Sequence, residues 1–171
     1  MSLIQIQWSS QVLGKQTQAQ VIYPNAGKPP FPVLYLLHGL SDDSSMWTRL
    51  TRLEAYAAAF PMAIVMPDGY RGFYTNNEEG PAFALHIGEE LPAMIERTLH
   101  VRAERGGRAI GGLSMGGYGA LRIGLGYPDR FCSIHSHSGA LDAGKTVARF
   151  SEANPAAYGP NVPAEMKRIF G

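Results

Sequence analysis

The stretch GGLSMGGYGA, residues 111–120, holds a Gly-x-Ser-x-Gly core with Ser114 at its centre. The residues before it, 108–113, read as a buried strand, and residues 118–126 look helical despite their glycines. Glycines two residues either side of such a serine let a strand turn sharply into a helix, because side chains there would clash. The helix then directs its first N–H groups at the serine, which favours negative charge beside it. In this context the pattern indicates a nucleophile rather than a purely structural glycine turn.

Outward from this core, short apolar runs alternate with stretches of helical spacing. The runs predict buried strands at residues 33–37 (VLYLL), 63–66, 108–111 and 131–136. Helical spacing predicts helices at residues 47–60, 83–99 and 118–126, with Pro92 as a local inconsistency. Polar and apolar residues alternate at 4–8 and 19–23, which predicts two half-buried strands. The order predicts an α/β fold, with a mostly parallel sheet covered by helices on both faces.

Composition bounds the class of protein. A chain of 171 residues fits a single domain, 1–171, and its formal net charge of +1 makes nucleic acid a poor partner. One cysteine, Cys132, excludes an internal disulfide. There is no secretory signal pattern, and no apolar run reaches the roughly 18 residues that span a bilayer. We expect a cytoplasmic protein that does not associate with a membrane.

The predicted strands place their following residues at one edge of the sheet. Ligands bind beyond the carboxyl ends of parallel strands, and the segments there begin at His38, Asp68, Ser114 and Ser136. An oxyanion hole needs two backbone donors. Met115 follows the nucleophile and supplies one, and Leu40, in the loop after VLYLL, is the natural second donor. We therefore expect one site at this edge.

Several segments together resemble a known family. They are YLLHGL at 35–40, VMPDG at 65–69, GFYT at 72–75, Trp47, and IGGLSMGGYGALRIGLGYPDRF at 110–131. They are similar to the esterase D-type esterases, which include S-formylglutathione hydrolases, tributyrin-type esterases, acetylxylan and feruloyl esterases, and the related mycolyltransferases. The resemblance runs from residue 20 onward.

This resemblance implies an α/β-hydrolase fold with Ser114 as nucleophile and the N–H groups of Leu40 and Met115 as oxyanion donors. It also implies that Trp47 and Tyr74 lie near the acyl pocket. We expect no cofactor and no metal. The predicted function is a serine carboxylester hydrolase acting on small acyl esters. Acyl transfer to a sugar or thiol, and a non-catalytic binding module, are the alternatives.

The chain departs from this family in its catalytic acid and base. In this fold the triad follows the order Ser, then Asp or Glu, then His. After Ser114 the histidines are His135 and His137, and they precede every later acid except Asp129, whose position in YPDRF is typical of a turn cap. We therefore expect the acid and base beyond Gly171, and interpret the chain as the first two-thirds or so of the domain, with its C-terminal strands missing.

Alone, such a fragment is expected to be weak or inactive as an enzyme, and to self-associate or bind a complementing C-terminal segment.

His137 is the alternative base. The His-x-His spacing of a metal site has no third ligand cluster to support it. We expect His38 to make a structural hydrogen bond, His86 to be solvated and Cys132 to be buried.

Overall fold

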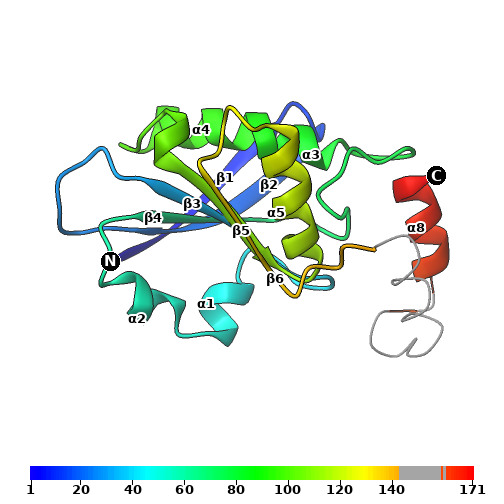
Figure 1. The fold of residues 1–171 in the computed structure, drawn as a ribbon, viewed down its shortest axis with the longest axis horizontal. Coiled ribbons are helices and arrows are strands. Elements are labelled where there is room, and N and C mark those ends of the chain that lie inside the picture. The colour runs from blue at the N-terminus through cyan, green and yellow to red at the C-terminus, as the bar shows by residue number, and fades with distance from the viewer. Residues whose placement is uncertain (143–158, 160) are drawn as a thin grey trace.

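A computed structural model describes residues 1–142, 159 and 161–171, and Figure 1 shows their arrangement. One sheet contains β1 (Ser2–Ser10), β2 (Lys15–Tyr23), β3 (Val33–Leu37), β4 (Ala63–Pro67), β5 (Arg108–Leu113) and β6 (Ser133–His137). The spatial order of the strands is β1-β2-β4-β3-β5-β6. β2 pairs antiparallel with β1 and β4, whereas β4, β3, β5 and β6 run parallel. The predicted mostly parallel sheet is confirmed.

Helices cover both faces of this sheet (Figure 1). One face carries α3 (Phe83–Leu85), the π-helical segment η1 (His86–Glu90), α4 (Leu91–Thr98) and α5 (Met115–Gly126), and the other carries α1 (Met46–Leu50) and α2 (Leu53–Ala57). The 3-10 turn η2 (Arg105–Gly107) leads into β5, and α8 (Val162–Phe170) is the last described helix. Within the described ranges no helix is long and apolar enough to cross a membrane.

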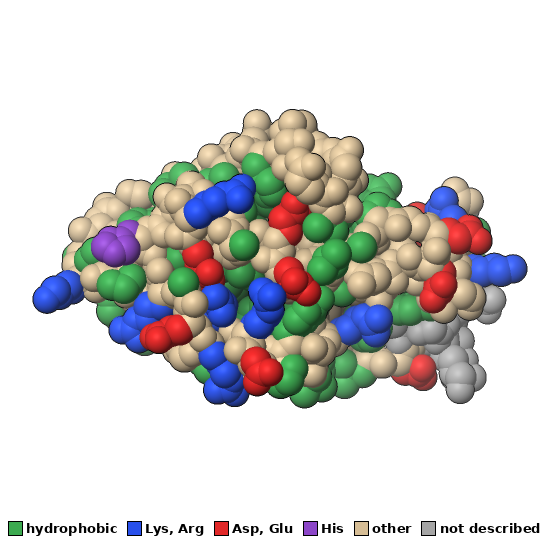
Figure 2. Space-filling model, turned by 90° about the horizontal axis from the view of Figure 1, so that it is seen from above, with side chains coloured by type: hydrophobic (Ala, Val, Ile, Leu, Met, Phe, Trp, Pro, Cys, Tyr) green, Lys and Arg blue, Asp and Glu red, His purple; other side chains and the backbone are tan. Residues whose placement is uncertain are grey.

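The strand residues alternate between two apolar cores. In β3, Val33, Tyr35 and Leu37 belong to the larger core on the α4 and α5 face, whereas Leu34 and Leu36 belong to the smaller core on the α1 and α2 face. This alternation explains why VLYLL is a continuous apolar run: a central strand buries both of its sides. Seen from above, acidic and basic side chains are interspersed over the surface rather than gathered by sign (Figure 2).

Thr51 divides the helix predicted for residues 47–60 into two short helices, α1 and α2. The prediction of one continuous helix is therefore wrong. Thr51 is extended, with φ −134° and ψ 175°. Its hydroxyl donates to the Trp47 carbonyl and accepts the Leu53 N–H at 3.1 Å. A hydroxyl that bonds nearby backbone competes with the helical hydrogen bonds, and α1 ends here.

Pro92 is accommodated by a π-turn rather than by a break. The Leu91 N–H bonds to the His86 carbonyl, five residues earlier. Proline has no N–H to donate to the carbonyl of Gly88, and its ring crowds that carbonyl. The wider turn of η1 gives the ring room, and Arg130 Nη1 lies 3.5 Å from the Gly88 oxygen.

β6 is the outermost strand of the described sheet on the β5 side. Ser133, Ser136 and His137 on this strand are exposed, and so is Cys132 just before it. The prediction that Cys132 is buried is wrong, because the described residues place no further strand along this edge.

Burial in the larger core predicts a contrast between two leucines. Leu91 on α4 is fully buried, whereas Leu125 on α5 is 69% exposed. Leu91→Ala should lower the free energy of unfolding by about 2–5 kcal/mol, because it removes core contacts and leaves a cavity. Leu125→Ala should change it by less than about 0.5 kcal/mol. Urea unfolding of both variants checks this, and equal losses would contradict the assignment of the core.

Candidate active site

Backbone strain is concentrated at one edge of the sheet. The non-glycine residues with positive φ in the described ranges are Ser41, Tyr70, Phe73, Tyr74, Ser114 and Ser138. Every one of them lies in the segment after the carboxyl end of β3, β4, β5 or β6. Such conformations cost about 1–3 kcal/mol each and persist only where the surroundings hold them, which is typical of functional sites. The segments that we expected to meet at this edge of the sheet therefore also carry the backbone strain.

Ser114 occupies a sharp turn between β5 and α5, with φ 55° and ψ −114°. The glycines on either side are sterically required. A Cβ on Gly112 would lie 2.4 Å from the Gly116 carbonyl oxygen, and a Cβ on Gly116 would lie 2.4 Å from the Leu37 oxygen and 2.6 Å from the His38 oxygen. The geometry matches the steric reason inferred from the sequence.

The end of β6 fixes the backbone of this turn. The Ser114 N–H donates to the His137 carbonyl at 2.9 Å, and the Ser114 carbonyl accepts the Ala140 N–H at 3.1 Å. Ser114 remains partly exposed. Among residues 1–142, 159 and 161–171, no imidazole nitrogen or carboxylate is hydrogen-bonded to its hydroxyl.

The two predicted oxyanion donors flank the close contact between α5 and the end of β3. Met115 is the first residue of α5, and Leu40 follows β3 by three positions. Helix geometry leaves the first N–H groups of α5 without partners inside the helix. Within the described part of the chain, neither the Leu40 nor the Met115 N–H donates to a protein acceptor.

Side chains from separate segments hold the backbone before Leu40. Trp47 Nε1 donates to the Leu37 carbonyl at 3.3 Å, and the Tyr74 hydroxyl donates to the His38 carbonyl at 3.1 Å. Tyr74 is completely buried, and burial raises the pKa of its phenol well above the usual value, so the hydroxyl keeps its proton. Both residues predicted to lie near the acyl pocket therefore contact the backbone that leads to Leu40.

His38 makes the structural hydrogen bonds expected of it. Its Nδ1 lies 2.7 Å from the Gly39 oxygen, and its Nε2 accepts the Gly69 N–H at 2.9 Å. These partners require a neutral ring with its proton on Nδ1. Asp68 Oδ1 lies 3.7 Å from Nε2. The Tyr70 N–H donates to the Asp68 carboxylate at 2.8 Å.

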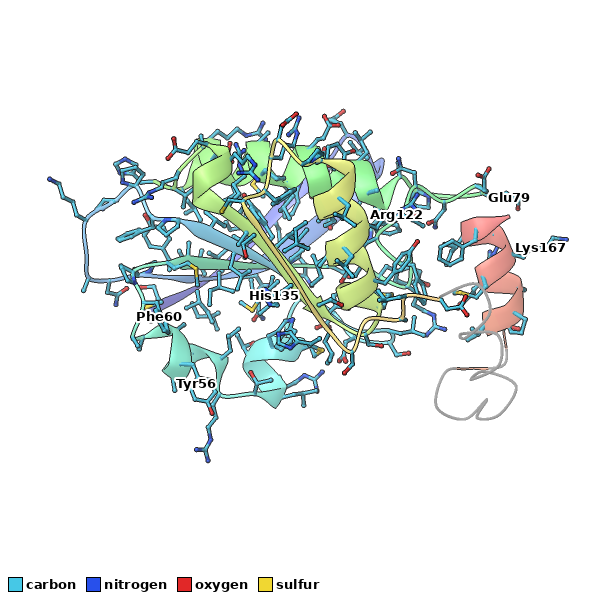
Figure 3. The ribbon with its side chains drawn as sticks, in the orientation of Figure 1. Tyr56, Phe60, Glu79, Arg122, His135 and Lys167 are labelled. Carbon is cyan, nitrogen blue, oxygen red and sulfur yellow. The ribbon has the colours of Figure 1, made fainter. Side chains whose placement is uncertain are left out.

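The remaining histidines differ in their environments. His135 lies over Gly111, on the face of the sheet that carries α1 (Figure 3). Its ring centroid is 4.9 Å from that of His137. Burial, and then the charge on His137, lower the pKa of His135. His86 is fully buried, with Nδ1 2.6 Å from Glu90 Oε2, so the prediction that it is solvated is wrong. Packing under the β1–β2 hairpin buries it, through Ser10 and Trp8.

Sequence patterns did not predict an ion pair next to the loop that carries Leu40. Arg71 bonds to Glu165 on α8 and to the hydroxyl of Ser41, which follows Leu40. No sequence signal joins residues that are 94 positions apart, as Arg71 and Glu165 are.

No group of three or more His, Cys, Asp or Glu side chains in the described ranges could hold a metal ion.

Comparisons with known proteins show the family to which the chain belongs. A family model described as putative esterase matches residues 10–165. An acetyl esterase from Caldicellulosiruptor saccharolyticus is 33% identical over 153 residues, which cover 82% of this chain and 57% of the relative. An esterase from Mycobacterium tuberculosis is 40% identical over 124 residues, which cover 68% of this chain and 27% of the relative.

A solved structure confirms the fold. The fluorophosphonate-binding serine hydrolase F from Staphylococcus aureus superposes with a TM-score of 0.80 at 25% identity, covering 94% of this chain and 64% of that protein. The predicted α/β-hydrolase fold and the resemblance to esterases are thus confirmed. The chain spans a little more than half the length of the acetyl esterase that it matches.

The tight contact at Gly116 predicts a contrast within one helix. Gly116→Ala should destabilise the fold by more than about 1 kcal/mol, because its Cβ would meet two backbone oxygens that cannot move independently. Gly126→Ala, at the exposed end of α5 with no atom within 4 Å of the added Cβ, should be neutral or stabilising by up to about 1 kcal/mol. The urea unfolding midpoints of the two variants measure this difference. Unchanged midpoints in both variants would refute the close approach of α5 to the end of β3.

Proposed function

The chain belongs to the family of putative esterases, and on that premise we propose that the whole protein is a serine carboxylester hydrolase acting on small acyl esters. One observation carries the proposal: Ser114 stands on a strained turn, at the contact that brings the N–H groups of Met115 and Leu40 to the same edge of the sheet. The acetyl esterase among its relatives supports a short acyl group.

The reaction follows from these positions. Ser114 Oγ attacks the ester carbonyl carbon while a general base takes its proton, and the carbonyl oxygen becomes an oxyanion that the Leu40 and Met115 N–H groups stabilise. Collapse of this intermediate expels the alcohol, which receives the proton from the base, and leaves an acyl group on Ser114. Water, activated by the same base, then releases the acid and restores the serine.

We place the base and its acid partner in a segment of the whole protein beyond Gly171, so that chain 1–171 is the N-terminal part of one domain. Two described histidines support this: both ring nitrogens of His38 have backbone partners, and His86 is completely buried. His137 is exposed and remains the alternative base. The missing segment, or a second copy of the chain, is the proposed partner of the β6 edge.

The nucleophile is tested by labelling with a fluorophosphonate probe. We expect the product of the complete open reading frame to be labelled at Ser114, and Ser114→Ala to abolish labelling and lower turnover of p-nitrophenyl acetate by about 10⁴- to 10⁶-fold. Chain 1–171 should be labelled weakly and turn over ester slowly. Ser138→Ala is the matched control and should be labelled normally. Labelling at Ser138 would overturn the assignment, and ordinary turnover by chain 1–171 would make His137 the base.

The oxyanion donor is tested by removing a single N–H group. Leu40→Pro lacks the N–H donor and should lower kcat by about 10²- to 10³-fold. Leu40→Ala keeps the donor and should lower kcat only slightly. Steady-state hydrolysis of p-nitrophenyl acetate by the complete protein measures both. Equal losses in the two variants would assign Leu40 a packing role.

A further inference from the structure

Arg71 joins α8 to the loop that carries the proposed oxyanion donor. Its Nε lies 3.0 Å and its Nη2 lies 2.7 Å from Glu165 Oε2, while its Nη1 donates to Ser41 Oγ at 2.8 Å. Arg71 belongs to the segment after β4, Glu165 to α8, and Ser41 to the segment after β3. One guanidinium therefore bridges three separate parts of the chain.

The guanidinium geometry explains why arginine serves here. Two neighbouring N–H groups of its planar fork bond to the carboxylate while a third points elsewhere, which a lysine ammonium cannot reproduce. The Arg71 and Glu165 side chains are each only 21% exposed, so solvent screens their attraction less than that of an exposed pair. The bridge is therefore directional and specific to arginine.

The backbone on the two sides of Leu40 is held differently. Before Leu40, the buried side chains of Tyr74 and His38 hold the carbonyls of residues 38 and 39. After Leu40, the Asp42 N–H reaches the Gly39 oxygen only at 3.4 Å, and the Arg49–Asp42 pair is long, at 3.3 Å, with Arg49 57% exposed. The contact from Arg71 to the Ser41 hydroxyl, at 2.8 Å, is shorter than both of these, and Ser41 has a φ of 69°.

We propose that Arg71 is a positioning residue for the oxyanion hole: through Ser41 it holds the Leu40 N–H in place, and through Glu165 it makes that position depend on α8. The proposal rests on the proposed function, because it concerns the donor for that reaction. Arg71 touches no reacting atom. Its effect is to reduce the freedom of the loop, so that the donor is directed at the developing charge before the substrate arrives.

α8 also has contacts that do not involve Arg71. Phe170 packs edge-to-face against Phe73 and Tyr118, with ring centroids 5.7 and 6.0 Å apart. The N–H groups of Glu78 and Glu79 donate to the α8 carbonyls of residues 169 and 168, at 3.3 and 2.9 Å. These two amides report whether α8 stays docked when the ion pair is removed.

Amide hydrogen exchange in chain 1–171 tests the coupling without requiring catalysis. Arg71→Lys and Glu165→Ala should each speed exchange of the Asp42 amide, which donates to the Gly39 oxygen, by about tenfold or more, because loss of an anchor raises the population of open loop. Residues 33–37 in β3 should be unchanged. The amides of Glu78 and Glu79 should stay protected, which separates loss of the bridge from loss of α8. Arg130→Lys, which alters a similar pair with Glu89 at 3.3 Å, is the matched control and should leave exchange of the Asp42 amide unchanged.

Kinetics of the complete protein provide the second readout. Arg71→Lys and Glu165→Ala should lower kcat for p-nitrophenyl acetate by about tenfold or more, with little change in KM, because the donor acts mainly on the transition state. Unchanged exchange of the Asp42 amide, or faster exchange with unchanged kcat, would overturn the positioning role. Turnover that survives Ser114→Ala would instead overturn the proposed function, so the two failures are distinguishable.

Discussion

The close approach of α5 to the end of β3 is the constraint on which the site depends. It exists because Gly116 has no Cβ: any side chain there would collide with the carbonyl oxygens of Leu37 and His38. The contact brings together two backbone segments that come from different strands. Met115 begins the helix on one side of it, and Leu40 follows the strand on the other. Because Gly116 has no side chain, the N–H groups of Met115 and Leu40 can lie on either side of one close backbone contact.

Strain and buried polar contacts are linked at this edge. Positive φ at Ser114 and Tyr74 is unfavourable, and the surrounding bonds keep the chain in these conformations. The Tyr74 ring fills the space beside Gly69 and Gly119, where a Cβ would lie 2.1 and 2.5 Å from it, and its hydroxyl reaches the His38 carbonyl. Packing of the Tyr74 side chain therefore helps to fix the backbone that leads to Leu40.

The polar groups around the site divide into those that hold the backbone and those that remain free to react. His38 belongs to the first group, because both of its ring nitrogens have backbone partners. Ser114 belongs to the second, with a hydroxyl that has no imidazole or carboxylate partner within residues 1–142, 159 and 161–171.

Local patterns were enough to predict the strand VLYLL, the turn at Ser114 and its flanking glycines, because side-chain alternation and steric clash act over a few residues. The pattern also identified Leu40 and Met115 as candidate donors. It predicted neither the break at Thr51, where a hydroxyl competes with the helix, nor the burial of His86 under the β1–β2 hairpin. The bridge from Arg71 to Glu165 joins residues 94 positions apart, and only the packing of α8 brings them together. Chain periodicity and the Gly-x-Ser-x-Gly pattern therefore determined the elements and the turn at Ser114. Tertiary packing decided which polar groups hold the loop at Leu40, because that depends on contacts between segments distant in sequence.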